Sequence, residues 1–305
     1  VLFPYSGNKI KFKEEMVEMY NLAHKDNIDT ICDTFLGAGG SISSLYNTFL
    51  DKGIKNLIVN DFNHTLINTH QSVAERTEEL ISSVINTYRT IQLLNDNIFN
   101  PSEDTLEKFK KAFLVLEKSQ NYRNIQTSAL FLFFQNITFS GAYKGVFEDG
   151  KDFINTKASA KIYDINRYFQ GLLNTIVKIK EYSKIYNSFN TVFMNEDYRL
   201  LVDKLKNDDN VLFLFDPPYY DSSANYGLKE GDFNQRELLE KLSGLDFLYN
   251  NNKHREIFEF IQKYNYHSMS KLRRNNSSSK SDIPVYEYLV ASNKHNMKPV
   301  QLTIS

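Results

Sequence analysis

The sequence contains one cysteine, no tryptophan and no apolar run near the ~20 residues that a membrane-spanning helix needs. Cys32 alone excludes an internal disulfide and a cysteine-rich metal site, and it fits a reducing, cytoplasmic setting. We expect no membrane association, and we recognise no targeting segment. Because tryptophan is absent, only the 23 phenylalanines and 19 tyrosines could stack on the rings of a ligand, and we expect most of them in the core.

An excess of charge of one sign is also lacking, since the formal net charge is −1. This balance argues against a broad nucleic-acid-binding coat, so a site for a polyanion must be a local patch. Residues 266–298 are a candidate patch, because six Lys or Arg stand there against two acids. A solvated loop is the alternative interpretation. The length of 305 residues allows one large domain or two modest ones.

Residues 211–220 read Val-Leu-Phe-Leu-Phe-Asp-Pro-Pro-Tyr-Tyr. Five consecutive apolar residues predict a short strand that is buried on both faces, and the two prolines end it. Asp216 and Tyr219 would then lie at the carboxyl edge of a parallel sheet, where open α/β folds bind ligands. A strand that simply stops at a Pro-Pro turn is the alternative.

Three more predicted strands, at 29–33, 56–61 and 191–194, end in or run into the acids Asp33, Asp61 and Asp197. A glycine-rich loop, Thr34 to Ser41, follows the first strand and precedes a helix, which is typical of a nucleotide cradle. Ile42 stands where a dinucleotide fingerprint has its third glycine, which disfavours NAD. The spacing of Asp61 suits ribose hydroxyls, with a helix cap as the alternative.

Outside these strands the chain is predicted to be mainly helical, apart from a carboxyl-terminal hairpin of residues 266–272 and 285–291. Helices are expected over most of 64–135 and 149–188, with a loop of considerable reach at 136–145. Near the start, Ser6-Gly7-Asn8 ahead of a helix, beside Lys9, could bind a carboxylate or phosphate. A plain helix-entry turn is the interpretation that the segment alone favours.

Five motifs in this order resemble the Dam-type, D12 class DNA N6-adenine methyltransferases with an Asp-Pro-Pro-Tyr active site. The motifs are Tyr5-Ser-Gly-Asn-Lys9, Asp33-Thr-Phe-Leu-Gly-Ala-Gly39, Asn60-Asp-Phe-Asn63, Asp197-Tyr198 and Asp216 to Tyr219. The resemblance implies an α/β, Rossmann-like class I methyltransferase sheet, mostly parallel with a C-terminal antiparallel hairpin. It also implies an inserted, mainly helical target-recognition domain at 64–188, with the catalytic domain formed by 1–63 and 189–305.

The resemblance implies S-adenosylmethionine as methyl donor. Its carboxylate would lie against Tyr5, Lys9 and the glycine loop, its ribose against Asp61, and its adenine between Phe35, Phe62 and the Asp197-Tyr198 corner. The donor-site residues implied in this way are Tyr5, Lys9, Asp33, Phe35, Gly37, Gly39, Ser41, Asp61, Phe62, Asp197 and Tyr198. No metal is expected.

The substrate implied by the resemblance is double-stranded DNA. Family members read DNA with an aromatic-x-Gly-x-x-Arg loop, which Phe139-Ser140-Gly-Ala-Tyr-Lys144 matches except for its last residue. Lysine cannot form the planar fork that arginine makes to guanine, so the target sequence is not expected to be the family's usual GATC. Lys271, Arg273 and Arg274 are further candidate DNA contacts. A cognate restriction endonuclease is a candidate partner, and we expect a monomer or a weak dimer on DNA, in the cytoplasm.

The four residues Asp216, Pro217, Pro218 and Tyr219 are predicted to carry the chemistry. The Asp216 carboxylate and Pro217 carbonyl can each accept an N6–H bond from adenine, Pro218 fixes the turn, and Tyr219 offers a ring face to an extruded base. Other functions stay open at this point: a nucleotide-dependent oxidoreductase, a catalytically silent DNA-binding protein, or a methyltransferase acting on cytosine N4 or on RNA adenine.

Overall fold

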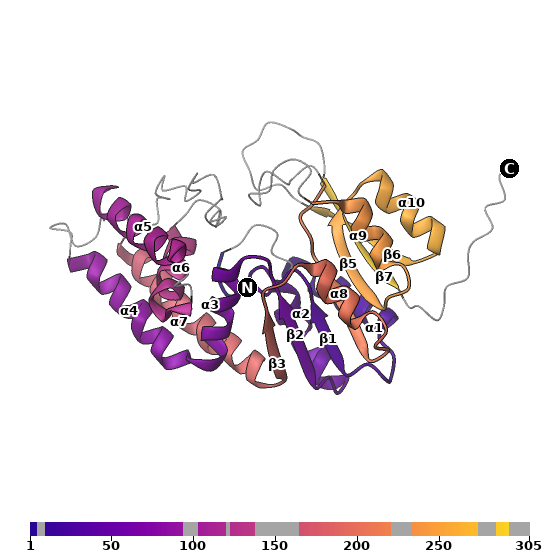
Figure 1. Cartoon of the computed structure of the whole chain (residues 1–305), viewed down its shortest axis with the longest axis horizontal. Coiled ribbons are helices and arrows are strands. Elements are labelled where there is room, and N and C mark those ends of the chain that lie inside the picture. Colours follow the sequence, from indigo (N-terminus) through magenta and orange to yellow (C-terminus); the bar gives the residue numbers. More distant parts are fainter. Residues whose placement is uncertain are drawn as a thin grey trace.

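A seven-stranded sheet organises the structure, a computed structural model that describes residues 1–4, 10–93, 103–119, 123–137, 165–220, 233–273 and 285–292. The strand order is β3-β2-β1-β4-β5-β7-β6 (Figure 1). The strands are β1 (Thr30–Asp33), β2 (Asn56–Asn60), β3 (Asn190–Met194), β4 (Val211–Phe215), β5 (Phe247–Asn252), β6 (His267–Arg273) and β7 (Val285–Ser292). The α/β sheet that the sequence predicted is confirmed.

The first five strands are parallel and β7 runs antiparallel between β5 and β6. In the register, Cys32 lies beside both Ile58 and Phe213, which places β1 and β4 at the centre of the sheet. Because the order reverses direction at β1 and β4, their carboxyl ends border the crevice in which such sheets bind ligands. The predicted C-terminal hairpin is also confirmed.

Strand β4 shows why the sheet is covered on both faces. All five of its residues are buried. Alternate side chains point to opposite faces of a strand, and Leu212 and Leu214 join one apolar cluster while Val211, Phe213 and Phe215 join another. Helices α1 (Lys13–Ala23) and α2 (Gly40–Asp51) contribute to the first cluster, and α8 (Tyr198–Leu205), α9 (Gln235–Leu242) and α10 (Arg255–Tyr264) to the second.

In the described parts of the segment between β2 and β3, five helices are found: α3 (His64–Glu75), α4 (Thr77–Leu93), α5 (Glu103–Lys118), α6 (Ile125–Ile137) and α7 (Ile165–Asn187). They pack beside the β3 edge of the sheet (Figure 1). The run from Ala129 to Phe134 in α6 is buried throughout, so α6 forms the centre of this group. A short 3₁₀ turn, Ile10–Phe12, leads into α1.

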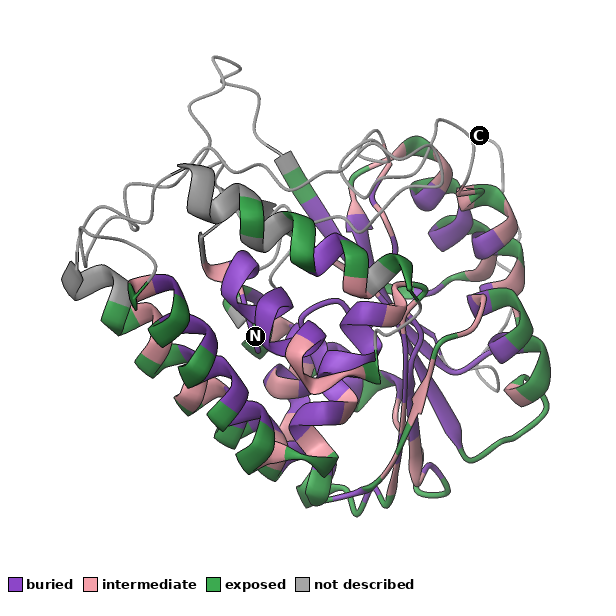
Figure 2. Ribbon diagram, turned by 60° about the vertical axis from the view of Figure 1, so that its left-hand side comes forward, coloured by how far each residue is buried: buried purple, intermediate pink, exposed green. Residues whose placement is uncertain are grey.

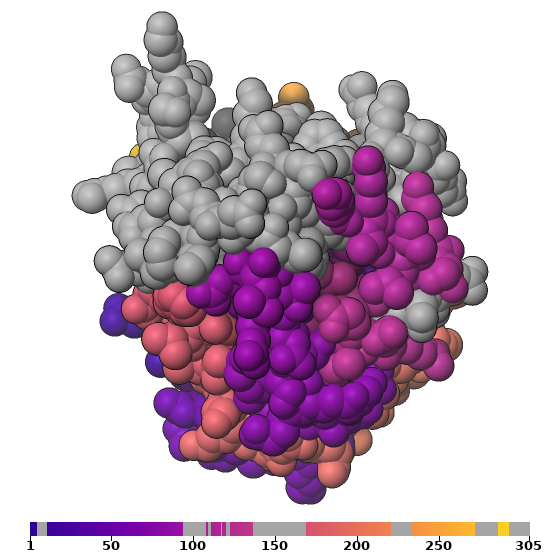
Figure 3. All heavy atoms as spheres, turned by 90° about the vertical axis from the view of Figure 1, so that its left-hand side faces the viewer, coloured from indigo at the N-terminus to yellow at the C-terminus, as the bar shows by residue number. Residues whose placement is uncertain are grey.

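The helical group has a continuous core with the sheet, because one apolar cluster includes residues of α1, α2, β4, α4, α6 and α7. Burial is concentrated on the inner faces of the helices and along the sheet, with exposed residues on the outer faces (Figure 2). From the helical end, α4 occupies the centre of the visible surface, with α5 and α7 on either side (Figure 3). No described helix is long and apolar enough to cross a membrane.

Candidate active site

Acidic residues from neighbouring strands meet at the carboxyl edge of the sheet. Asp33 ends β1, Asp61 follows β2 and Asp216 follows β4. Their proximity is visible in the electrostatics: burial raises the pKa of Asp33 well above its ordinary value, and the charges of Asp216 and Asp61 raise it further. The sequence-based inference that these strand ends converge is therefore correct for these three acids.

Only one oxygen of the buried Asp33 carboxylate is hydrogen-bonded within the described residues. Its Oδ1 accepts the N–H of Phe35 at 3.3 Å, whereas Oδ2 has no hydrogen-bond partner among the described residues. A buried carboxylate beside two others is costly unless a cation or a donor accompanies it. The geometry at the end of β1 thus favours a positively charged ligand.

Asp61 fixes the start of the glycine loop. Its Oδ2 accepts the N–H of Gly37 at 3.0 Å, and its Oδ1 accepts the N–H of Asn63 at 2.9 Å. Burial raises the pKa of Asp61 while these two bonds lower it. Gly37 and Gly39 have φ of 50° and 72°, the left-handed region that glycine adopts without strain. Asp61 therefore joins the loop to the end of β2.

A chain of hydrogen bonds holds the Asp-Pro-Pro-Tyr turn. The Nδ2 group of Asn250, near the end of β5, donates to Oδ1 of Asp216 at 3.1 Å and to the hydroxyl of Tyr219 at 2.7 Å. Tyr219 in turn donates to Oε2 of Glu287 on β7, at 3.1 Å. Asn250, Tyr219 and Glu287 are all buried. Three strands thus fix the orientation of the Asp216 carboxylate.

The next residue along, Tyr220, is held just as firmly. Its N–H donates to Oδ1 of Asn251 at 3.3 Å, and its carbonyl accepts from Nδ2 of Asn252 at 2.9 Å. Its ring stacks on His254 with centroids 3.8 Å apart and 9° between the planes. Gln235 donates to the carbonyl of Pro218. The backbone of the turn is therefore anchored to both β5 and the start of α9.

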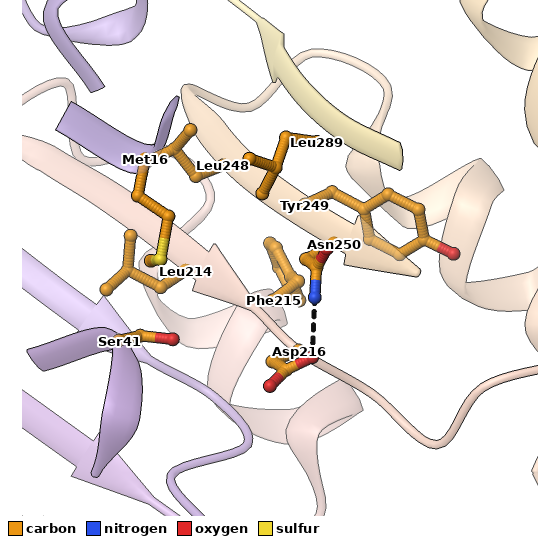
Figure 4. Close-up of a pocket in the computed structure, with 9 residues that line it drawn as sticks. All are labelled: Met16, Ser41, Leu214, Phe215, Asp216, Leu248, Tyr249, Asn250 and Leu289. Atoms are coloured by element: carbon orange, nitrogen blue, oxygen red, sulfur yellow. Dashed lines mark hydrogen bonds between the residues drawn. The ribbon is translucent and has the colours of Figure 1, made fainter. Parts of the chain in front are cut away.

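A pocket opens beside Asp216 (Figure 4). Asn250 and Asp216 face one another at the ends of β5 and β4, and Ser41 approaches from the start of α2. Oδ1 of Asn250 is buried and lacks a partner among the described residues. The lining residues are Met16, Ser41, Leu214, Phe215, Asp216, Leu248, Tyr249, Asn250 and Leu289.

Aromatic rings form a second feature of the same edge. Phe35 lies 5.2 Å from Tyr198 and 5.7 Å from Phe233, measured between ring centroids. Phe62 is 78% exposed, so its ring face is open to a ligand. Asp197 caps α8 and is paired with Arg199, which lowers its pKa. Phe35, Tyr198 and Phe233 therefore form one aromatic cluster.

Comparison with known families gives a decisive match: the model of the D12 class N6 adenine-specific DNA methyltransferases matches residues 5–295. The chain belongs to this family. A search of curated proteins found no match. The protein is therefore an enzyme that methylates N6 of adenine in DNA, on a class I methyltransferase fold. The oxidoreductase and silent DNA-binding alternatives, and those with cytosine or RNA as acceptor, are set aside by the family.

Within this methyltransferase, several predicted site residues lie outside the described residues: Tyr5, Lys9, Phe139, Ser140, Lys144 and Arg274. Arg273 ends β6. Lys271 is half-exposed but pairs with Glu15 on α1, and its ammonium lies over the Phe12 ring at 5.5 Å. No group of metal ligands exists among the residues that the structure describes.

The methyltransferase site also contains residues that the sequence did not single out. Asn250, Asn251 and Asn252 form the second half of β5, a strand that the sequence analysis did not include. Glu287 looked like one of two acids in a basic hairpin. A run of three asparagines directly after an apolar strand was the available signal, because buried amides must be hydrogen-bonded.

Proposed function

We propose that this D12 class enzyme takes its methyl group from S-adenosylmethionine and transfers it to an adenine turned out of duplex DNA. The observation that supports the donor most strongly is the buried Asp33, whose Oδ2 lacks a partner among the described residues and which lies near Asp61 and Asp216. S-adenosylmethionine carries a sulfonium and an ammonium group. A cation at this edge would offset the repulsion among the three carboxylates.

The residues present fit such a donor. We assign Gly37, Gly39 and Ser41 to the donor's side of the crevice, and Asp33 to its positive charge. Asp61 uses one lone pair of each oxygen for Gly37 and Asn63, and each oxygen keeps a second lone pair that can accept from a ribose hydroxyl. We assign Phe35, Phe62, Asp197 and Tyr198 to the donor's adenine, and Tyr5 and Lys9 to its carboxylate.

The donor supplies an electrophilic methyl group on sulfur, and the chain's own residues prepare the acceptor. Adenine N6 is a poor nucleophile because its lone pair is delocalised into the ring. The Asp216 carboxylate and the Pro217 carbonyl each accept one N6–H bond, which favours a pyramidal nitrogen with its lone pair free. Transfer would form the C–N bond and break the C–S bond, with neutral S-adenosylhomocysteine as the leaving group. Asp216 would stabilise the positive charge that develops on N6, a contribution of about 3 kcal/mol or more for preorganised groups of this kind, and it can accept the proton that N6 then loses.

Rigidity of the turn is what makes this arrangement effective. Asn250 holds Asp216 in one orientation, Gln235 and Asn252 hold the backbone after it, and Pro217 and Pro218 restrict the remaining torsions. Removing a base from the duplex costs a few kcal/mol, and stacking on Tyr219 would offset part of that cost. Phe139 is assigned to the space that the base leaves.

We assign target recognition to the helical region 64–188 and catalysis to 1–63 and 189–305. Ser140 and Lys144 would contact bases, and Lys271, Arg273 and Arg274 the DNA backbone. With Lys144 in place of arginine, the target differs from GATC. We propose that the protein acts on DNA in the cytoplasm as a monomer or weak dimer. A cognate restriction endonuclease is a candidate partner.

Purified protein incubated with duplex DNA and S-adenosylmethionine tritiated in the methyl group tests this function. The label should appear on N6 of adenine, and Asp216→Ala should lower the rate by about 10²-fold or more while donor binding persists. Label on cytosine, or transfer by Asp216→Ala at the wild-type rate, would refute the assigned chemistry. Failure to bind S-adenosylmethionine would refute the donor.

A further inference from the structure

The glycine loop is held from behind by three segments that are distant in the sequence. Three successive carbonyls accept hydrogen bonds: Gly37 from the His70 ring at 2.9 Å, Ala38 from the N–H of Leu2 at 2.9 Å, and Gly39 from the hydroxyl of Tyr182 at 3.0 Å. The donors come from α3, the amino-terminal segment and α7. The carbonyls of the loop are therefore turned towards the helical group.

The pair formed by His70 and Tyr186 has a defined direction. A carbonyl only accepts, so Nε2 of His70 carries the hydrogen that it donates to Gly37. Nδ1 is then the acceptor for the Tyr186 hydroxyl, which lies 2.6 Å away. Both side chains are buried, and burial lowers the pKa of His70 to about 4. The imidazole thus stays neutral near pH 7. Its two hydrogen bonds connect Tyr186 on α7 to the carbonyl of Gly37.

Tyr182 determines the shape of the loop at Gly39. This glycine has φ of 72°, and a Cβ placed on it would lie 2.7 Å from Cε1 of Tyr182. The Tyr182 ring therefore fills the space where any other residue would carry its side chain. Its hydroxyl bonds the carbonyl of the same glycine, so a single side chain fixes both the backbone and the space behind it.

We propose that His70, Tyr182 and Tyr186 are positioning residues for methyl transfer, which hold the glycine loop in the form that binds the donor. The inference rests on the proposed function only in taking S-adenosylmethionine as the ligand of that loop. All three side chains are buried, and we assign them no direct contact with the donor. They act through the carbonyls of Gly37 and Gly39, and they link the loop to the two helices that border it.

Ordinary core packing is the competing explanation, and stability alone does not separate the two. A packing role predicts that losing the Tyr186 hydroxyl lowers Tm and leaves the kinetic constants unchanged. A positioning role predicts weaker donor binding in protein that is still folded. Tyr88→Phe provides the matched control, since it also removes a hydroxyl from a buried tyrosine of the helical group, where Tyr88 bonds Thr175 and Asn136 instead of the loop.

The experiment compares full-length wild type with Tyr186→Phe, His70→Leu, His70→Gln and Tyr88→Phe. It measures Kd for S-adenosylmethionine by calorimetry, KM for the donor and kcat on duplex DNA, and Tm. We expect Tyr186→Phe and His70→Leu to raise the donor Kd and KM about tenfold, the equivalent of one buried hydrogen bond, with kcat within about twofold. His70→Gln keeps an amide donor and an acceptor, so it should restore most of the affinity.

Tyr88→Phe should lower Tm without changing donor Kd. Unchanged donor Kd in Tyr186→Phe and His70→Leu, in folded protein, would overturn the positioning role while leaving the proposed function intact. An equal loss of affinity in Tyr88→Phe would overturn it too, because the effect would then be general. If wild type itself binds no S-adenosylmethionine, the proposed function fails first, and this inference falls with it.

Discussion

The Tyr219 hydroxyl donates to Oε2 of Glu287 at 3.1 Å, and both side chains are buried. One residue lies in the Asp-Pro-Pro-Tyr turn after β4 and the other on the antiparallel strand β7. The same hydroxyl accepts from Asn250, which also donates to Asp216. The hairpin of β6 and β7 is therefore connected to the Asp216 carboxylate by three hydrogen bonds in series, and it helps to fix the carboxylate that we assign to N6.

Replacing Glu287 tests this link. Glu287→Ala removes the acceptor for the Tyr219 hydroxyl, so Asn250 and Asp216 lose a fixed neighbour, and we expect kcat to fall about tenfold. Glu287→Gln still offers a carbonyl oxygen and should stay within about threefold of wild type. Steady-state methylation kinetics at saturating donor measure both. Equal kcat in Glu287→Ala and wild type would show that Tyr219 is oriented without Glu287.

Asn250 is expected to matter more, because it contacts Asp216 directly. Asn250→Ala should lower kcat by about 10- to 100-fold and leave the donor Kd within about threefold, since the amide orients the acceptor side of the reaction. Asn56→Ala is the matched control: its Nδ2 donates to Thr30 at 3.1 Å at the opposite edge of the sheet. Similar losses of kcat in the two variants would mean that the amide of Asn250 serves stability alone.

Asp33→Asn should separate stability from donor binding. The pKa of Asp33 is raised in the folded protein, so ionisation opposes folding. Stability falls as pH rises above the unfolded pKa of ~3.9, and the full cost is reached above the folded pKa. Removing the charge should raise the Tm of the ligand-free protein near pH 7.5, by about 2–4 °C for each kcal/mol gained. Donor affinity should fall at the same time. Lower Tm together with unchanged donor Kd would contradict this interpretation of Asp33.

His70 predicts a pH-dependent loss of stability on the acid side. Its pKa is about 4 in the folded protein and ~6.5 when unfolded, so the unfolded chain binds the extra proton first as pH falls. His70 contributes about 3 kcal/mol to the free energy of unfolding above pH ~6.5, and this contribution is lost as pH falls to ~4. His70→Gln should lack this component. Urea denaturation of both proteins at pH 7 and pH 4.5 measures it, and identical pH dependence would contradict it.

Much of the fold follows from local patterns. Short apolar runs predicted the strands correctly because a buried parallel strand needs no polar face, and β4 is buried at every position. Asn234 caps α9, since its side chain accepts from the N–H of Glu237 at 3.1 Å, and asparagine is a favoured residue at this position. Convergence of Asp33, Asp61 and Asp216 followed from the rule that parallel strands end at one edge.

The pairings that support the site were beyond the reach of sequence patterns. Asn250, Glu287, His70 and Tyr186 act through partners 31 to 116 positions away in the chain, and no spacing encodes such pairings. A tyrosine on a long helix is usually core. Only the folded chain shows that the hydroxyl of Tyr186 meets His70, and that the asparagines of β5 face the turn after β4.

Long-read sequencing that detects modified bases, applied to DNA from a methylation-deficient host expressing this chain, is the most direct test of the assigned reaction. We predict N6-methyladenine at one short recurring sequence other than GATC, and none in cells that express Asp216→Ala at equal level. Absence of N6-methyladenine in the wild-type culture, or its persistence with Asp216→Ala, would contradict the catalytic role of the carboxylate at the end of β4.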